Sequence, residues 1–465
     1  MNFIESLQTK NTTTENGMVT NSSTINECVN LFFTIGAMRG QDKERLLSKF
    51  SKAFNEDSLT AMKMVFWVRD IREGAGERTI FRDIMEYLSL NEPKVLAKNI
   101  QSIPEFGRWD DLEILFGTEL EQDAVTLIVN GLRNGNGLCA KWVPRKGFVF
   151  NRLRKELKTS PKELRKMLVQ LSNTVEQKMC SNQWSTIEYS KVPSLAMARY
   201  TNAFNKQDSE RFVKYLESLK QGTTKVNAST LYPYDVVKTL KYGKWELANE
   251  QWKSLPNFME GSNERILPVV DVSGSMNSII AGKTTCMDVS ISLGLYISER
   301  NEGAFKDAFI TFSRKPELQK LNGNLQSRYH QLLKVNWDMN TNLEAVFDLI
   351  LNQAVKNNIE QSEMPTKILI MSDMEFDQST RGSFTAQEMI KQKYDENGYQ
   401  IPDIIYWNIQ SRNENFPVRF DEMGTALISG LSPSIVKSIL GGEKMNPKKI
   451  MEKTLYIKRY KCITI

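Results

Sequence analysis

The apolar pattern changes near Ser262, and this change constrains the fold of the 465-residue chain more than any other feature. From about residue 27 to residue 253, apolar side chains recur at i, i+3, i+4 and i+7, which is the spacing of one helix face. Beyond residue 262, short runs rich in Ile and Val alternate with segments of helical pattern, as in a parallel, doubly wound α/β sheet. Because the chain is too long for one ordinary core, we predict a multidomain α and α/β protein.

We expect a helical domain over residues 26–260 and an α/β domain of Rossmann-like topology over residues 262–465. Short breakers such as NEP, RNGNG and TSP separate the helical stretches, which favours stacked helix pairs in a solenoid- or ring-like repeat domain. Residues 1–25 are polar and predict a flexible N-terminus. The stretch LYIKRYKCITI predicts either a last strand or packing on the helical domain. The predicted strands are ILPVVDV, AFITFS, KILIMSD, DIIYWNI and ALISG.

Cysteine and histidine content narrows the possible chemistry. The five cysteines lie far apart without a CxxC pair, which argues against a zinc site or a disulfide framework and suits a reducing compartment. Because His330 is the single histidine, catalysis based on histidine is nearly excluded. The N-terminus lacks a signal-peptide pattern, and no apolar run reaches the length of a membrane span. We therefore expect a cytoplasmic protein that is not an enzyme and does not enter a membrane.

The end of the first predicted strand carries a carboxylate and two hydroxyls. Asp271, Ser273 and Ser275 are two residues apart, so an extended turn directs all three to one point. Thr341, in a loop before a helix, and Asp373, after the strand KILIMS, are able to complete a shell at the carboxyl edge of the sheet. These are hard oxygen ligands, which favour Mg²⁺, with Mn²⁺ or Ca²⁺ as alternatives, over zinc.

This order of residues resembles the metal-ion-dependent adhesion site of a von Willebrand factor A domain. The resemblance implies that Asp271, Ser273 and Ser275 bind Mg²⁺, that Thr341 binds directly or through water, and that Asp373 acts through water. It also implies an open metal position that a carboxylate of a protein partner fills. A rival motif, AGKTT at Ala281–Thr285, lacks the first glycine of a phosphate-binding loop, because that position is Asn277.

Positive charge is concentrated in the helical part. Residues 131–200 hold 14 basic and 4 acidic side chains, whereas residues 262–465 are balanced at 24 of each. A local basic region with aromatic residues predicts phosphate neutralisation and base stacking, so we expect RNA binding there. The alternative is a buried aromatic core beneath a solvated charged surface. The candidate nucleic-acid-binding residues are Lys141, Trp142, Arg145, Lys146, Arg152, Arg154 and Lys155.

Three further arginines flank the glycine turn REGAGER. Arg69, Arg72 and Arg78 are either phosphate contacts or partners of Asp70, Glu73 and Glu77, and we favour pairing.

Longer stretches resemble a protein family of uncharacterised function, of the domain of unknown function 2828 type. They are FWVRDIREGAGER, IPEFGRWDDL, KWVPRKG, WSTIEYSKVPSLAMARYTNAF, SDMEFD and ALISGLSP. The family pairs a helical region with a C-terminal von Willebrand A domain, a layout similar to the Ro (TROVE) proteins. That resemblance implies a ring of helical repeats that takes single-stranded RNA ends in its hole and structured RNA on its outer surface.

Three functional hypotheses follow. The first is a non-enzymatic, Ro-like RNA-binding protein whose A domain binds a divalent cation. The alternative is a metal-dependent protein-interaction scaffold in which the A domain captures an acidic residue of a partner. The third is a viral or virion component that uses either activity.

Overall fold

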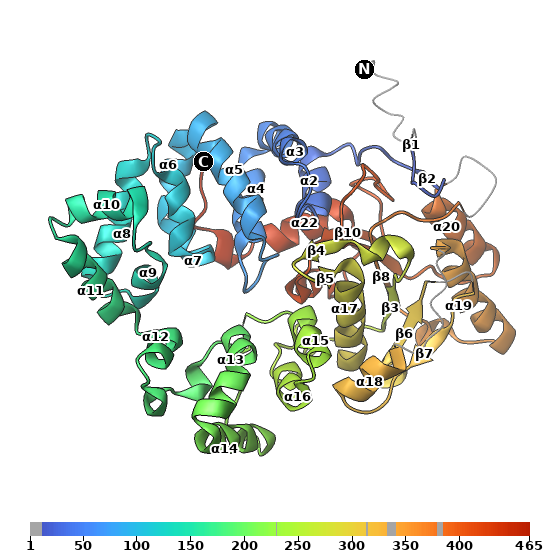
Figure 1. Cartoon of the computed structure of the whole chain (residues 1–465). Helices are drawn as coiled ribbons and strands as arrows, with labels where there is room; N and C mark the ends of the chain where they lie inside the picture. The colour runs from blue at the N-terminus through green and yellow to red at the C-terminus, as the bar shows by residue number, and fades with distance from the viewer. Residues whose placement is uncertain (1–11, 229, 313–314, 333–340, 379–384) are drawn as a thin grey trace. The chain divides into compact units, whose positions relative to one another are not determined.

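The computed structural model describes residues 12–228, 230–312, 315–332, 341–378 and 385–465, and its chain forms two compact units (Figure 1). The predicted helical N-terminal half and C-terminal α/β domain are both confirmed, but the chain crosses between the units several times. The α/β unit comprises the described residues of 1–57, 73–75 and 231–457, and the helical unit comprises those of 58–72, 76–230 and 458–465.

A six-stranded sheet forms the core of the α/β unit, in the order β10-β9-β8-β3-β6-β7. All neighbouring strands are parallel except β6 and β7. Four of the parallel strands are buried along their whole length, which explains their continuous apolar sequences. The strands are β3 (Ile266–Val270), β6 (Ala308–Thr311), β7 (Leu318–Lys320), β8 (Lys367–Ser372), β9 (Asp403–Asn408) and β10 (Thr425–Ser429).

The strand order reverses between β3 and β8. The chain leaves β3 for β6 on one side, while β8 pairs with β3 on the other. In doubly wound folds this reversal opens a crevice at the carboxyl ends of the two central strands. Helix α17 packs on β3, β6 and β8, and α19 packs on α20. The other elements after residue 262 are β4 (Ile279–Ala281), β5 (Thr284–Thr285), α17 (Cys286–Arg300), α18 (Leu325–Leu332), α19 (Leu343–Asn357), α20 (Ala386–Glu396), α21 (Val436–Ile439) and α22 (Pro447–Leu455).

Four helices from before residue 262 also belong to the α/β unit, so its division from the helical unit differs from the predicted boundary. They are α2 (Glu27–Ile35), α3 (Lys43–Glu56), α15 (Pro233–Lys241) and α16 (Trp245–Lys253). Helix α2 is buried from Cys28 to Ile35 and packs on β10. Gly36 permits this approach, because an added Cβ would lie 2.7 Å from the carbonyl oxygen of Ser429. Helical periodicity identifies a helix but not the surface that it covers.

The segment before α2 is held against the α/β unit. Strands β1 (Thr12–Thr13) and β2 (Val19–Thr20) pair antiparallel. The hydroxyl of Thr14 donates to the carbonyl of Phe376 at 2.6 Å, and Thr20 donates to the carbonyl of Phe416 at 3.0 Å. Residues 12–21 thus differ from the flexible segment expected over 1–25, of which residues 1–11 lie outside the described residues.

The helical unit is built from short amphipathic helices that pack on their neighbours in the chain. Helix α11 begins at Pro161, where the Ser160 hydroxyl accepts from the N–H of Glu163 at 3.2 Å and caps the helix. The helices are α4 (Ser58–Arg69), α5 (Arg78–Asn91), α6 (Pro93–Asn99), α7 (Ile103–Phe106), α8 (Glu121–Arg133), α9 (Gly137–Trp142), α10 (Gly147–Glu156), α11 (Pro161–Ser172), α12 (Val175–Cys180), α13 (Ser194–Gln207) and α14 (Ser209–Lys220).

The segment 458–465 completes the helical unit. Tyr460 is fully buried, with its ring centroid 5.5 Å from that of Phe106 and its carbonyl accepting from Lys63 Nζ at 2.6 Å. The backbone N–H of Thr464 donates to Asn99 at 3.0 Å. Of the two alternatives for this tail, packing on the helical domain is therefore correct. Across the described ranges, no helix has both the length and the apolar character that a membrane crossing needs.

Candidate metal site and basic surface

The two central strands bring two predicted ligands to the same edge of the sheet. Val270, the last residue of β3, pairs with Met371 of β8. Asp271 and Asp373 therefore follow neighbouring strands at the crevice where the strand order reverses. The N–H of Asp271 still donates to the carbonyl of Met371 at 3.1 Å, which fixes the position of the first carboxylate relative to β8.

Asp271 is fully buried and its carboxylate is well ordered by hydrogen bonds. Oδ1 accepts from the N–H of Ser273 at 2.9 Å, and Oδ2 accepts from the hydroxyl of Ser372 at 2.6 Å. Burial, with the charge of Asp373 nearby, raises the pKa of Asp271 to about 6. The buried carboxylates of Asp271 and Asp373 repel one another when both are charged. Positive charge beside them therefore favours their ionised forms.

The two predicted serine ligands lie together. Ser273 Oγ and Ser275 Oγ are 3.0 Å apart, and Ser275 is a half-buried residue of the turn η5 (Gly274–Asn277). Together with Asp271 they form a set of hard oxygen donors that fits Mg²⁺, Mn²⁺ or Ca²⁺. Among the described residues, no group of three or more His, Cys, Asp or Glu side chains is arranged to hold a metal ion.

Thr341 is buried but engaged elsewhere. Its hydroxyl donates to the carbonyl of Glu375 at 2.9 Å and lies 3.2 Å from Asp377 Oδ1, and its N–H donates to Asp377 Oδ2 at 2.8 Å. Within the described part of the chain it forms no hydrogen bond to the other four predicted ligands. The structure thus joins Thr341 to the loop after β8. Hydrogen bonds link Asp271 to Ser273 and Ser273 to Ser275, and Asp373 follows the neighbouring strand.

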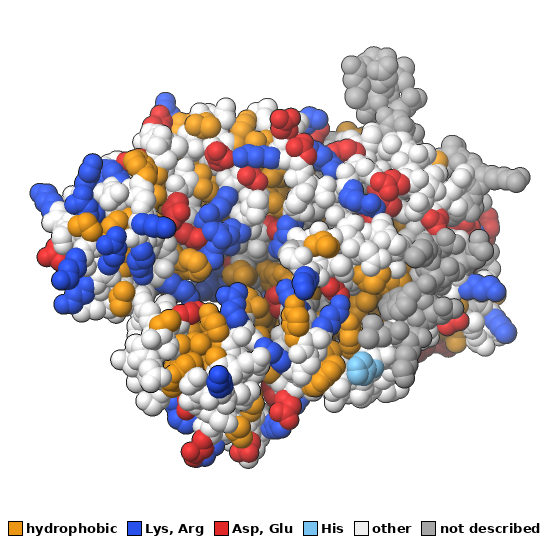
Figure 2. All heavy atoms as spheres, in the orientation of Figure 1, with side chains coloured by type: hydrophobic (Ala, Val, Ile, Leu, Met, Phe, Trp, Pro, Cys, Tyr) orange, Lys and Arg blue, Asp and Glu red, His pale blue; other side chains and the backbone are white. Residues whose placement is uncertain are grey.

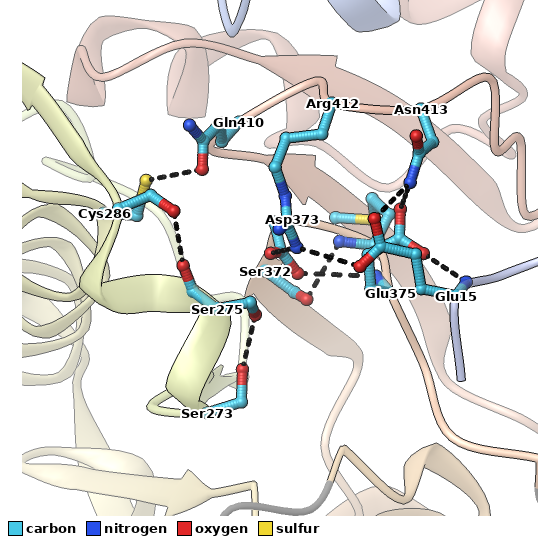
Figure 3. A network of polar contacts seen from close by, with 12 residues as sticks. Glu15, Ser273, Ser275, Cys286, Ser372, Asp373, Glu375, Gln410, Arg412 and Asn413 are labelled. Atoms are coloured by element: carbon cyan, nitrogen blue, oxygen red, sulfur yellow. Dashed lines mark hydrogen bonds and ion pairs between the residues drawn. The ribbon is translucent and has the colours of Figure 1, made fainter.

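An arginine that no sequence motif identifies contacts the site (Figure 3). Arg412 Nη2 donates to Asp373 Oδ2 at 2.7 Å, and the Asp373 side chain is fully buried. Arg412 comes from the loop after β9, where no motif surrounds it. Proximity of this loop to β8 follows from strand order, so only the fold reveals it.

A second buried carboxylate beside the site holds the N-terminal segment. Glu375 Oε2 accepts from the N–H of Glu15 at 2.7 Å, and Oε1 accepts from Asn413 and Asn415 at 2.9 and 2.8 Å. Burial raises the pKa of Glu375. Cys286 is also buried here and donates to Gln410 Oε1 at 3.3 Å. Because burial raises the pKa of Cys286 to about 12, it stays a thiol and is a poor metal ligand.

In the helical unit, the predicted nucleic-acid-binding residues fall into two groups. The three arginines bond within the unit: Arg145 donates to the carbonyls of Ala140 and Val143, Arg152 pairs with Glu121 and Glu156, and Arg154 donates to the carbonyl of Thr159. The three lysines are exposed: Lys141, Lys146 and Lys155. Trp142 is half-buried, and the guanidinium of Arg108 lies 3.9 Å from its ring centroid.

Exposed cations extend beyond the predicted residues. Lys and Arg side chains gather over α8, α10 and α11, at the left of Figure 2. Between residues 133 and 166 the exposed acidic side chain is Glu163, against eight exposed basic ones. Phe148 is 63% exposed among them, whereas Phe150 is buried. We call the eight residues the basic surface: Arg133, Lys141, Lys146, Lys155, Lys158, Lys162, Arg165 and Lys166.

Two of the three arginines around the glycine turn, Arg69 and Arg78, are paired, but with different acids from those predicted. Arg69 Nε donates to Asp111 Oδ2 at 2.8 Å, and Arg78 Nη2 to Asp110 Oδ2 at 2.6 Å. Asp70 instead accepts from Arg459 Nη2 at 2.9 Å. Pairing was the favoured prediction, and the structure places the acids in η2 (Trp109–Leu115) and the arginine in segment 458–465.

Comparisons with known proteins divide the chain near the change in apolar pattern at residue 262, and not at the limits of the two compact units. Residues 14–123 and 145–264 match the model of a domain of unknown function, DUF2828, and residues 265–460 match that of another, DUF7788. An uncharacterized protein of Acanthamoeba polyphaga mimivirus, L728, is 29% identical over 499 residues, covering 94% of this chain and 86% of that protein.

Among solved structures, the Ro (RSR) protein of Deinococcus radiodurans aligns over 93% of this chain and 99% of its own. The TM-score is 0.40 at 12% identity, which is too low to support an argument about fold or function. The chain thus joins a segment similar to the DUF2828 domain to a C-terminal segment similar to the DUF7788 domain.

Proposed function

We propose that the helical unit binds RNA through the basic surface, as a non-enzymatic RNA-binding protein. The observation that carries this proposal is the excess of exposed cations between residues 133 and 166, where one exposed acid faces eight exposed basic residues. Such a surface neutralises phosphates and releases their counterions. The exposed ring of Phe148 lies among these cations and offers a face on which an unpaired base stacks.

The predicted residues divide their roles on this surface. Lys141, Lys146 and Lys155 are exposed and suit phosphate contacts. Arg145, whose guanidinium donates to Val143 at 2.6 Å, supports the turn between α9 and α10 instead. The guanidinium of Arg108 covers the ring of Trp142, so we assign base stacking first to the exposed Phe148.

Charge reversal on α10 and α11 tests the RNA proposal. We expect the triple variant Lys155→Glu, Lys158→Glu and Lys162→Glu to weaken binding of a labelled single-stranded RNA. The slope of log Kobs against log salt should also fall in magnitude by about 2, because each lost phosphate contact removes about 0.7 for a single strand. The measurement is fluorescence anisotropy from 50 to 300 mM salt, roughly the range in which the counterion term is largest.

The matched control carries the same charge change in the α/β unit. Lys391, Lys448 and Lys449 are exposed there, and their triple replacement by Glu should leave the slope unchanged. An equal loss in both triple variants would show that only net charge matters and would refute a site on the basic surface. EDTA should have no effect on this binding.

A second candidate function is supported by the oxygen cluster at the edge of the sheet. We propose that Asp271, Ser273, Ser275 and Asp373 hold Mg²⁺, or Mn²⁺ or Ca²⁺, and that Thr341, in the loop before α19, supports the site through its hydrogen bonds to the loop after β8. The cation would supply an electrophilic position for a carboxylate of a protein partner. The 3.0 Å separation of the two serine hydroxyls beside the buried Asp271 supports this proposal.

Replacement of Ser275 by Ala tests the metal site with little risk to folding, because Ser275 is only half-buried. We expect Mg²⁺ affinity, measured by isothermal titration calorimetry, to fall by about tenfold or more, since one direct ligand is lost. Asp271→Ala should abolish binding. Ser362→Ala removes an exposed hydroxyl of the same unit; it is the control and should bind like the unchanged protein. Equal affinity in Ser275→Ala and the unchanged protein would contradict the proposed ligand set.

A further inference from the structure

Arg412 is shared between a proposed metal-site carboxylate and the N-terminal segment. Its Nη2 donates to Asp373 Oδ2 at 2.7 Å and lies 3.6 Å from Glu15 Oε2 (Figure 3). The Asp373 side chain is fully buried, whereas that of Glu15 is 53% exposed. The guanidinium therefore places a positive charge on the buried carboxylate and has a second, solvent-facing carboxylate within reach.

The backbone of Arg412 is fixed independently of its side chain. Arg45 Nη1 donates to the carbonyls of Ser411 and Arg412 at 3.0 and 2.6 Å. Lys49 Nζ pairs with Glu414 at 2.5 Å in the same loop. Since α3 anchors the loop in this way, the guanidinium is able to leave Asp373 without unfolding the loop.

The contact with Asp373 does not satisfy the guanidinium fully. Within the described part of the chain, Arg412 Nε is buried without a hydrogen-bond partner. A buried donor without an acceptor destabilises this position of the arginine side chain. Less free energy is therefore needed to move the guanidinium to another acceptor. Glu15 also accepts from Asn413 at 2.9 Å, so it stays beside the loop as a second acceptor.

We propose that Arg412 is an internal counter-cation that competes with the divalent cation for Asp373, and that its guanidinium moves to Glu15 when the cation binds. This inference rests on the proposed metal site. A cation and a guanidinium repel one another at the same carboxylate, so the side chain that neutralises Asp373 without metal also lowers the affinity for metal. The pair Arg412 and Glu15 thereby sets the cation concentration at which the site fills.

Arg412→Gln tests the competition directly. We expect Mg²⁺ to bind about tenfold more tightly than to the unchanged protein, because the competing charge is removed. Arg412→Lys keeps the charge and should stay within about threefold of the unchanged protein. Arg419→Gln removes an arginine of the same unit that lies 3.8 Å from Asp421, and should leave the affinity unchanged. The readout is isothermal titration calorimetry with MgCl₂ on metal-stripped protein.

Glu15→Gln tests where the guanidinium goes. The amide oxygen still accepts from Asn413 but offers Arg412 no charge, so Mg²⁺ should bind about threefold more weakly. In the Arg412→Gln background the same change should have little effect. An equal effect in both backgrounds would overturn the movement to Glu15.

The failure of this inference is distinguishable from the failure of the metal site. If the unchanged protein and Arg412→Gln bind Mg²⁺ with equal affinity, the site stands and the competition is refuted. If neither binds Mg²⁺ at millimolar concentration, the proposed metal site and the inference are both refuted. Melting temperatures measured without metal separate either result from a loss of folding.

Discussion

Replacement of Asp111 by Asn will lower the free energy of unfolding of the helical unit by about 3–5 kcal/mol, the usual cost of breaking a buried ion pair from one side. The Asp111 side chain is fully buried. It accepts from Arg69 at 2.8 Å, from Arg82 at 2.7 Å and from the N–H of Arg108 at 2.9 Å. Arg69 is itself 5% exposed, so the amide would leave a nearly buried guanidinium without its countercharge.

The effect of this change depends on pH in a defined direction. Burial alone would raise the pKa of Asp111, but Arg69, Arg82 and the Arg108 N–H outweigh it and lower the pKa below its ordinary value of 3.8. The carboxylate therefore stabilises the fold above about pH 4, and this contribution is lost as the pH falls through its lowered pKa. The difference between Asp111→Asn and the unchanged protein should shrink as the pH falls from 6 to about 3.

Chemical denaturation followed by circular dichroism measures both effects. Glu119→Gln removes an exposed carboxylate of the same unit and should change stability by about 0.5 kcal/mol or less. A similarly small change in Asp111→Asn would mean that the arginines find other partners, and would contradict the buried pairing described above.

Replacement of Tyr460 by Ala should destabilise the helical unit by about 3–5 kcal/mol, as for other buried aromatic residues. The ring of Tyr460 is fully buried beside Phe106, and its hydroxyl donates to Asp70 Oδ2 at 3.1 Å. Tyr460→Phe keeps the ring and should cost about 1.5–3 kcal/mol, the range for a hydrogen bond to a charged group.

Phe148→Ala is the matched control, because Phe148 is a large aromatic residue of the same unit that is 63% exposed. It should leave stability nearly unchanged while weakening RNA binding. If Tyr460→Ala unfolds at the same denaturant concentration as Phe148→Ala, segment 458–465 does not hold the unit together.

The sequence predicted the parallel strands because burial on both faces leaves a continuous apolar run. ILPVVDV, KILIMSD and DIIYWNI contain β3, β8 and β9. The antiparallel edge strand β7 was not predicted, since it is only three residues long, largely exposed, and contains Leu318 as its one apolar residue. The helices were predicted from the spacing of their apolar side chains alone. This spacing does not show which element each helix packs against. The assignment of α2 to the helical domain failed for that reason, as its apolar surface covers β10.

For the candidate site, the sequence predicted the proximities that follow from strand order but not those that depend on loop geometry. Asp271 and Asp373 end strands whose neighbours follow from the doubly wound order, so their proximity was derivable. Thr341 matched a motif, but its hydroxyl bonds to the carbonyl of Glu375, a contact that no motif encodes. Arg412 and Glu15 are 397 residues apart in the chain and carry no pattern. Their contact depends on loop geometry, which spacing does not predict.

The place of segment 458–465 in the helical unit has a consequence for biosynthesis. Residues 76–230 emerge from the ribosome long before Lys458, and translation at about 5–20 residues per second puts roughly 10–45 s between Thr230 and that residue. During this interval the surface around Phe106 that Tyr460 later covers stays open to solvent and to chaperones. The helical unit, although mostly N-terminal, therefore completes its core only after the α/β unit has been translated.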